Sequence, residues 1–397
     1  MMKKSNKLSI GFTGDIAFDE YTSNYYDNPD KIDKRLLSFL GSNDYNVIDL
    51  ESPVTLSNET EKEALFHKLE PKHLDYIKKI IKCPIADLAN NHMMDYGYVG
   101  LNDTLKYLKI KNIPYIGAGK NLRDASNYII LGDDVKVGVI AVEYKDYYIA
   151  SSENAGPFHE SCLNVLKERV FELKNKVDWI VVVYHGGEEF LRVPMPYTKK
   201  LLYKILDFGV DIIVAHHPHV VEGYEKVGKK MIFYSLGNFI FDTDFQRAQK
   251  YTDEGVLLSI KFSKNDYSFE NKCLKIDRKN EKIVLSDVNN NFKEIDKTNY
   301  SKLWRKEALR IREISNNKRK LRQTRISKYL GEGENKVVSF SYFESLLEGK
   351  DIKVEAVHVG LLKKIKNHRY VRLLRECFVN KKYRYYVYAK IINIFKK

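Results

Sequence analysis

Short apolar runs alternate with amphipathic segments through the first 260 residues of the chain. A strand that is buried on both faces of a sheet gives such a run, because every side chain along it lies in a core. These runs lie at residues 8–12, 46–48, 85–89, 135–142, 179–184, 212–215 and 231–236. Apolar side chains recur at helical spacing in the segments 31–40, 71–81, 100–109, 163–176 and 197–208. The alternation predicts an α/β fold in which helices cover both faces of the sheet.

The pattern changes twice in the remaining part of the chain. Residues 255–262 and 282–285 are apolar runs that we interpret as closing strands of an antiparallel meander. Farther along, helical spacing predicts helices over 303–329, 340–347 and 354–367. We therefore expect one α/β domain over residues 1–300 and a basic, mostly helical C-terminal extension over 301–397.

The net charge of +14 is concentrated at the C-terminal end. Residues 302–397 hold 26 Lys and Arg against 9 Asp and Glu, a net charge of +17, whereas the first 301 residues carry a net charge of −3. Three explanations are open: a solvated helical face, binding to an anionic membrane surface with Tyr and Ile side chains in the interface, and binding to nucleic acid. No recognition motif supports nucleic acid, which is the weakest of the three.

Membrane spanning and disulfide bonding are not indicated by the sequence. No stretch approaches the roughly 20 apolar residues that cross a bilayer, and residues 8–12 are too few for the apolar part of a signal peptide. The cysteines are widely spaced and form no paired motif: Cys83, Cys162, Cys273 and Cys377. We expect reduced thiols in a cytoplasmic protein, with any membrane contact peripheral at the inner face.

Side chains that bind metals stand where the predicted strands end. Three of the ten histidines fall within residues 216–219, directly after an apolar run. Ligands bind outside the carboxyl ends of strands in open α/β sheets, and imidazole and carboxylate groups bind divalent cations. The candidate metal ligands are Asp15, Glu51, Asn91, His185, His217 and His219.

Each candidate also has an ordinary structural explanation. Asp15 could form a turn at a strand end, Glu51 could be solvated, and Asn91 could cap the helix that follows it. The same pattern recurs at successive strand ends, however, and such a recurrence favours a shared site over separate coincidences.

These residues belong to motifs that resemble a known family. The motifs are Gly14-Asp15, Asp49-Leu50-Glu51-Ser52-Pro53, Asn90-Asn91-His92 with Asp95, His185 with Glu189, His216-His217-Pro218-His219, and Tyr234-Ser235-Leu236-Gly237-Asn238 with Asp242. In this order, over residues 7–260, they resemble the CapA family of poly-γ-glutamate and capsule synthesis proteins, within the calcineurin-like metallophosphoesterase superfamily. Three positions depart from the family pattern: Asp49 stands where Asn is usual, Gly186 where Trp is usual, and Ala215 where Gly is usual.

The resemblance implies a metallophosphoesterase-like layered sandwich of mixed sheets flanked by helices. It also implies one or two divalent metal ions, and does not distinguish Mn, Zn, Fe and Mg. Asp15 and Glu51 would share or bridge the metals, and Asn91 would bind one of them through its side-chain oxygen. His92 would assist the leaving group, and Asp95 is counted with it as a catalytic residue that could also orient a metal-bound imidazole. The residues expected to orient the metal ligands are His216, Glu189, Asn238 and Asp242.

One further departure concerns the metal ligands. Metallophosphoesterases typically open with Asp-x-His, whereas Asp15-Ile16-Ala17 places an alanine at the imidazole position. One metal position therefore has one ligand fewer, a loss that the CapA-like pattern shares.

The histidines outside these motifs are given no role: His67, His73, His159, His358 and His368.

The resemblance implies a protein of capsule or exopolymer biosynthesis, acting on poly-γ-glutamate or a polysaccharide. The leading expectation is a metal-dependent hydrolase that uses a metal-activated water against a phosphoester or a related anionic bond. The first alternative is a non-hydrolytic component of polymer synthesis or export that binds the polymer at a metal-bridged site. The second is an interaction protein whose basic tail is the working part. The expected partner is an anionic polymer or a phosphorylated substrate.

Since family members often carry an N-terminal membrane anchor, we predict that the basic residues 302–397 substitute for one. The full chain should float with vesicles that contain anionic lipid, and a chain truncated to residues 1–300 should remain at the bottom of the gradient. Liposome flotation measures this, with uncharged vesicles as the control. Equal flotation of the two chains would contradict the prediction.

Overall fold

The computed structural model describes residues 7–60, 66–144, 149–286 and 291–330. The helices expected over 340–347 and 354–367 lie outside these residues. The chain divides into two compact units, Met1–Tyr300 and Ser301–Lys397, and each is considered by itself. The assignment of residues 1–300 to one domain and of 301–397 to a mostly helical extension stays a prediction. Within the described part, none of the helices combines the length and the apolar character needed to cross a membrane.

A mixed sheet of eight strands forms one half of the first unit. Its order is β16 (Lys282–Leu285), β15 (Tyr267–Asp277), β14 (Glu254–Phe262), β1 (Leu8–Glu20), β2 (Tyr45–Leu50), β3 (Pro84–Asp87) and β4 (Tyr115–Ile116), and β13 (Asn238–Asp242) also pairs with β1. Strands β1 to β4 run parallel to one another, whereas β14, β15 and β16 form an antiparallel meander, of which the outer two strands were expected.

A second mixed sheet of six strands faces the first. Its order is β11 (Tyr224–Val227), β12 (Lys230–Phe233), β10 (Ile212–His216), β9 (Trp179–His185), β7 (Val137–Glu143) and β6 (Ile129–Leu131). The four strands β12, β10, β9 and β7 are parallel. A separate two-stranded pair joins β5 (Ala118–Gly119) and β8 (Gly156–Pro157).

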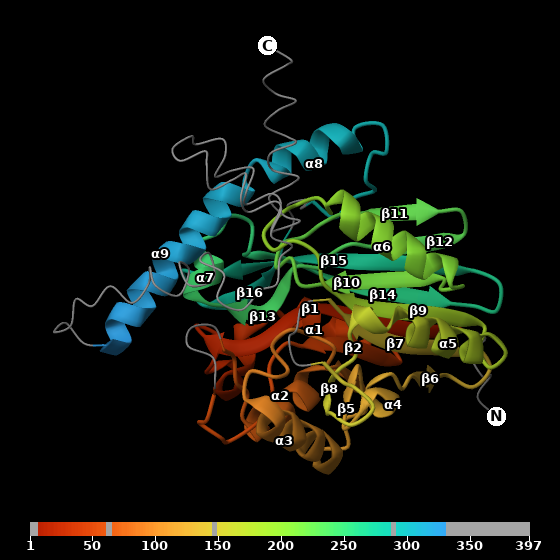
Figure 1. The fold of residues 1–397 in the computed structure, drawn as a ribbon, viewed down its shortest axis with the longest axis horizontal. Helices are drawn as coiled ribbons and strands as arrows, with labels where there is room; N and C mark the ends of the chain where they lie inside the picture. Colours follow the sequence, from red (N-terminus) through yellow and green to blue (C-terminus); the bar gives the residue numbers. More distant parts are fainter. Residues whose placement is uncertain (1–6, 61–65, 145–148, 287–290, 331–397) are drawn as a thin grey trace, which may run out of the picture. The chain divides into compact units, whose positions relative to one another are not determined.

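Alternating side chains explain how the layers stack. Val181 and Val183 of β9 pack in the core between the two sheets, with Phe12 and Val47 of the first sheet. Val182, which points to the opposite face, packs instead under helices, as the two-residue period of a strand requires. The helices α1 (Lys34–Gly41), α2 (Pro71–Ile80) and α3 (Gly97–Ile110) cover the first sheet, and α5 (Leu163–Lys174) and α6 (Pro196–Asp207) cover the second (Figure 1). The expectation of mixed sheets flanked by helices is confirmed.

Several short strands were not predicted, among them β4, β6 and β11, and three longer segments also differ from the prediction. The apolar run at 231–236 is not one strand: β12 ends at Phe233, and β13 then pairs with β1 in the other sheet. Strand β15 was not predicted, because polar residues interrupt it and it gives no continuous apolar run; many of its positions are half-buried or exposed. The basic helix expected over 303–329 is two helices, α8 (Tyr300–Ala308) and α9 (Ile311–Leu330), and neither Gly nor Pro signals the break between them.

Strand register places two rows of polar side chains at the carboxyl ends of the facing sheets. In the first sheet, Asp49 of β2 lies opposite both Asp15 of β1 and Asp87 of β3. In the second sheet, His185 of β9 lies opposite both Glu143 of β7 and His216 of β10. The alignment of parallel strands thus collects residues that are far apart in the sequence.

We predict that Gly14→Ala destabilises the fold by about 1–3 kcal/mol, as overpacking does. An added Cβ would lie 2.2 Å from the backbone oxygen of Gly237, which accepts a hydrogen bond from the Asp15 N–H. Urea denaturation measures the free energy of unfolding. The matched control is Gly41→Ala, because nothing lies within 4 Å of its added Cβ; it should be neutral or stabilising by up to about 1 kcal/mol. An equal effect of the two substitutions would contradict the prediction.

Candidate metal centre

The candidate site lies where the carboxyl ends of the two sheets meet. Asp15 comes from β1, Glu51 follows β2 directly, His185 ends β9 and His216 ends β10. All four side chains are at most 1% exposed. Buried carboxylates are costly unless they are paired with cations or hydrogen-bond donors. The buried carboxylates at this junction therefore need a positively charged partner.

The buried side chains form three groups with metal-ligating atoms within 4.8 Å of one another. The groups are Glu51 with His217 and His219, Asp15 with Asp49 and His216, and Asp49 with Glu51 and His185. Because Glu51 and Asp49 each belong to two groups, the three groups form one continuous cluster. Carboxylate oxygens mixed with imidazole nitrogens are a set that borderline divalent cations such as Zn²⁺, Mn²⁺ and Fe²⁺ accept.

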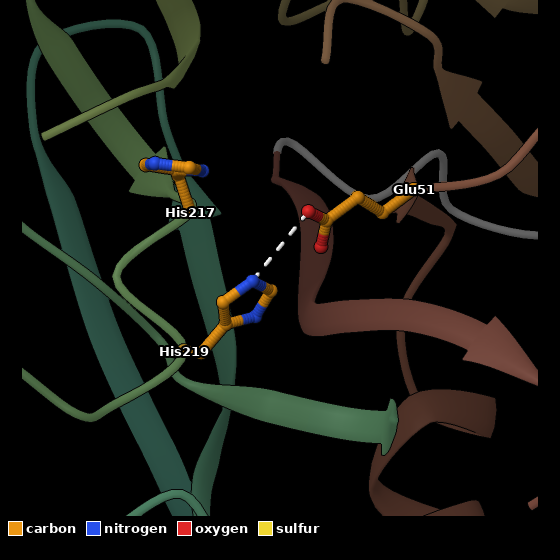
Figure 2. A group of neighbouring side chains, drawn as sticks. All are labelled: Glu51, His217 and His219. Carbon is orange, nitrogen blue, oxygen red and sulfur yellow. Dashed lines mark ion pairs between the residues drawn. The ribbon is translucent and has the colours of Figure 1, made fainter. Parts of the chain in front are cut away.

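Glu51 is at the centre of this cluster. Its Oε1 lies 3.6 Å from Nε2 of His185, 3.6 Å from Nε2 of His219 and 3.9 Å from Nε2 of His92. Figure 2 shows the ring of His219 directed at this carboxylate, with His217 on the same side of it. Three imidazoles from separate segments thus converge on one carboxylate oxygen, as the ligands of a bound cation would.

Asp49 determines which nitrogen of His185 is available. Nδ1 of His185 lies 2.9 Å from the Oδ2 atom of Asp49 and donates its proton to it. Nε2 is then the nitrogen left to bind a metal ion, and the side-chain oxygen of Asn91, another candidate ligand, lies 2.9 Å from it. A carboxylate behind an imidazole in this way fixes the tautomer of a metal ligand.

His219 is oriented in the same manner by two acceptors. Its Nδ1 lies 3.0 Å from Oδ2 of Asp15 and 3.0 Å from Oδ1 of Asn238. The amide nitrogen of Asn238 donates to the Thr252 carbonyl at 2.9 Å, which turns Oδ1 toward the imidazole. Nδ1 of His219 therefore carries the proton, and Nε2 keeps its lone pair toward Glu51.

Asp15 and His216 form a buried ion pair beside this cluster. The Oδ1 atom of Asp15 lies 3.1 Å from Nδ1 of His216. Burial raises the pKa of Asp15, but hydrogen bonds and charges from His216 and His219 outweigh burial and hold this pKa well below its usual range. Burial likewise lowers the pKa of His216, yet the Asp15 hydrogen bond and the charges of Asp49 and Asp15 raise it above the ordinary value. Asp15 is thus a carboxylate, able to bind a cation.

His92 and Asp95 form a pair at the edge of the cluster. Nδ1 of His92 donates to Oδ2 of Asp95 at 2.7 Å, so its Nε2 faces Glu51. Asp95 is buried, whereas the His92 side chain keeps 12% of its surface exposed. This is the position in which an imidazole can reach both the cluster and an incoming molecule.

The turn after β10 has an unusual backbone. His217 and His219 have φ angles of 95° and 55°, in the left-handed region that non-glycine residues rarely adopt. Nε2 of His217 lies 3.7 Å from Oε1 of Glu189, the contact expected of an orienting carboxylate. Strained backbone that directs two adjacent imidazoles to one place is typical of a functional site.

Two expectations are not met by the structure. The carboxylate of Asp242 accepts hydrogen bonds from Arg247 at 2.8 Å and Arg278 at 3.0 Å, so it ties these arginines together and does not orient a metal ligand. Asn91 does not cap the next helix, because α3 begins at Gly97 after Tyr96. The structure brings the side chains of the other site residues together. Their roles as metal ligands or catalytic residues stay predictions.

Three acidic residues of the site were missed. Asp49 was noted only as a departure from the family pattern, yet it contacts His185. Glu143 and Asp87 each end a buried strand, which is the same signal that singled out Asp15. Burial, followed by the charges of Asp49 and Glu143, raises the pKa of Asp87 well above its usual value.

Fold and site together define an α/β protein with a buried candidate centre for divalent cations. The chain belongs to the bacterial capsule synthesis protein PGA_cap family, whose model matches residues 9–243. That segment contains the candidate ligands from Asp15 to His219.

Two curated relatives carry related names. The chain is 30% identical over 259 residues to the capsule biosynthesis protein CapA of Bacillus anthracis, covering 62% of this chain and 63% of that protein. It is 31% identical over 264 residues to the PGA biosynthesis protein CapA of Bacillus subtilis (strain 168), covering 65% of this chain and 68% of that protein. The alignments thus span about two thirds of these relatives' length.

A solved structure is also similar at a distance. It is that of a Staphylococcus aureus protein in complex with alpha-ketoglutarate, provisionally titled a 5'-nucleotidase, with 17% identity and a TM-score of 0.42 over 75% of this chain and 58% of that chain. This likeness is too distant to bear on function.

We predict that the purified chain binds a divalent cation and that single substitutions in the cluster weaken this binding. Glu51→Gln and His217→Ala each remove a ligand, and both should abolish stoichiometric metal content after dialysis. Asp49→Asn should raise the dissociation constant about 10- to 100-fold, as loss of an orienting carboxylate does. Elemental analysis and titration calorimetry measure these effects.

The control for this test is Asp242→Asn, because that carboxylate pairs with arginines. It should keep the metal content of the wild type. Equal metal content in all four variants would contradict the assignment.

Proposed function

We propose that this chain is a metal-dependent hydrolase of capsule or exopolymer biosynthesis, metallophosphoesterase-like in its chemistry, that cleaves a phosphoester or a related anionic bond. The observation that carries the proposal is the continuous cluster of buried carboxylates and imidazoles at the sheet junction. The names of the relatives, which speak of capsule and PGA biosynthesis, support the biological setting.

The donor set of the cluster fits one or two divalent cations. Asp15, Glu51, Asn91, His185, His217 and His219 would hold them. When bound, such cations supply the Lewis acidity that activates a water for attack and neutralises charge on the ester. Donating a proton and orienting the ligands are roles of the chain's own side chains.

Those side chains suit the protonation of a leaving group. Nδ1 of His92 donates to Asp95, so Nε2 faces the centre, and in the imidazolium form this nitrogen would give its proton to the leaving group. Asp49 and Asn238 keep the Nδ1 atoms of His185 and His219 protonated, which preserves the lone pairs on their Nε2 atoms. Burial excludes bulk water and strengthens each of these interactions.

A second candidate function is non-hydrolytic. The chain would then bind an anionic polymer such as polyglutamate at a metal-bridged site, as a component of synthesis or export. The relatives' names favour this candidate, because they speak of biosynthesis and not of hydrolysis. Ala17, buried at the position of the usual imidazole, favours it as well, since one metal position has a ligand fewer.

The partners that we propose are inferred from the positive charge of bound cations and of the basic C-terminal residues. A centre with bound cations would attract an anionic polymer or a phosphorylated substrate. The basic residues 302–397 would contact an anionic membrane surface from the inner side of the membrane, and nucleic acid is the less supported partner.

Our prediction for activity uses aryl phosphate mono- and diesters with added Mn²⁺. The wild type should hydrolyse at least one of them, and a chelator should abolish turnover. Asp15→Ala and His217→Ala should lower kcat/KM by at least about 100-fold while circular dichroism shows an intact fold. Asp242→Asn is the matched control and should retain turnover.

Retained activity in both Asp15→Ala and His217→Ala would refute the hydrolase. Metal-dependent binding of polyglutamate without turnover of any ester would instead support the second candidate.

A further inference from the structure

His67 is a buried histidine next to the candidate centre that no sequence motif singled out. Its residue is 6% exposed. It lies in the segment between β2 and α2, where the neighbouring Leu69 hydrogen-bonds through its backbone with Pro53 and Thr55. His67 therefore belongs to an anchored stretch of chain that runs beside the motif of Glu51.

The ring of His67 lies directly against the ring of His92. Their centroids are 4.2 Å apart, and the planes are tilted by 58°. Phe241 packs edge-on against His67 at 5.0 Å, and also against His219 at 4.8 Å. The His67 ring thus occupies the space into which the His92 ring would otherwise rotate.

A hydrogen-bonded chain connects the end of β1 with His92 through His67. Nδ1 of His67 lies 2.5 Å from Oδ2 of Asp19, a residue of β1. The backbone N–H of His67 donates to Oδ2 of Asp95 at 2.6 Å. That same oxygen accepts the proton of His92 Nδ1 at 2.7 Å.

We propose that His67, anchored by Asp19, is a positioning residue for His92. Its ring limits the rotation of the His92 imidazole, and its backbone N–H holds the Asp95 carboxylate in the orientation that keeps Nδ1 of His92 protonated. Nε2 of His92 is then directed at the cluster around Glu51. The catalytic part of this proposal rests on the proposed hydrolase function; the positioning itself does not.

The substitutions that test the proposal are His67→Ala, which removes the ring, and Asp19→Ala, which removes the anchor. The matched control is His73→Ala. His73 is also a buried histidine, 4% exposed, but it stacks on Phe18 and contacts the Ser23 carbonyl instead of His92. The control therefore reports the general cost of deleting a buried imidazole.

The kinetic test compares phenyl phosphate with p-nitrophenyl phosphate as substrate. His67→Ala and Asp19→Ala should lower kcat for the phenyl ester about 10- to 100-fold with little change in KM, because a misplaced acid fails most with the poorer leaving group. The loss should be smaller for the p-nitrophenyl ester. In a His92→Ala background, adding His67→Ala should cost nothing further, since residues that act through one another are not additive.

The second readout is independent of turnover. In ¹⁵N-histidine spectra of the wild type, His92 should show a protonated Nδ1, and His67→Ala should convert this signal to a mixture of tautomers. His73→Ala should leave the His92 signal unchanged.

A kinetic loss that is equal for the two esters, or that adds fully to His92→Ala, would overturn the proposal. If the wild type hydrolyses neither ester, the hydrolase proposal fails for them and the spectra decide: an unaltered His92 signal in His67→Ala and Asp19→Ala overturns the positioning role, and an altered one supports it.

Discussion

The burial of several carboxylates at one sheet junction is the constraint on which the rest of the structure depends. Asp15, Asp49 and Glu51 have at most 1% of their surface exposed, and charge in such surroundings must be balanced locally. The molecule balances it with imidazoles from the facing sheet, first by the contact of Asp15 with His216 and then by that of Asp49 with His185. The two sheets are therefore joined by charge at this edge, whereas apolar packing joins them elsewhere.

The same pairing decides the chemistry that the imidazoles can perform. A histidine has two nitrogens, and the partner of one determines what remains on the other. Asp49 and Asn238 occupy the Nδ1 atoms of His185 and His219, which leaves the Nε2 atoms of both facing Glu51. The pairing of Asp95 with His92 follows the identical rule and directs a third Nε2 at the same carboxylate. Residues that contact no cation would thus determine how tightly one is held.

The family match ends at one place in the chain, and the basic excess begins at another. The family model ends at residue 243, after the motif segments of the site. The meander β14 to β16 then completes the first sheet, and the carbonyl of Thr252, just before β14, accepts the hydrogen bond that orients Asn238. The basic excess begins only after residue 301. The segment that makes this chain basic is therefore separate in sequence from the segment that carries the candidate chemistry.

Much of the fold could be predicted from the sequence, because buried strands and amphipathic helices leave a local periodic signal: α2, α5 and β9 lie within two residues of their expected bounds. The candidate ligands could be predicted for a related reason, since each closely follows an apolar run of the sequence. The residues that pair with these ligands could not be predicted from the sequence. Asp49, Asp87 and Glu143 acquire their surroundings only through strand register, and His67 acquires its place beside His92 through a segment with no periodic signal. Asp242 shows the converse, because it ends β13 and yet its carboxylate pairs with two arginines. Local sequence determined which residue types stand at the ends of strands; three-dimensional packing decided which of them meet, because contacts between distant segments depend on register and chain path.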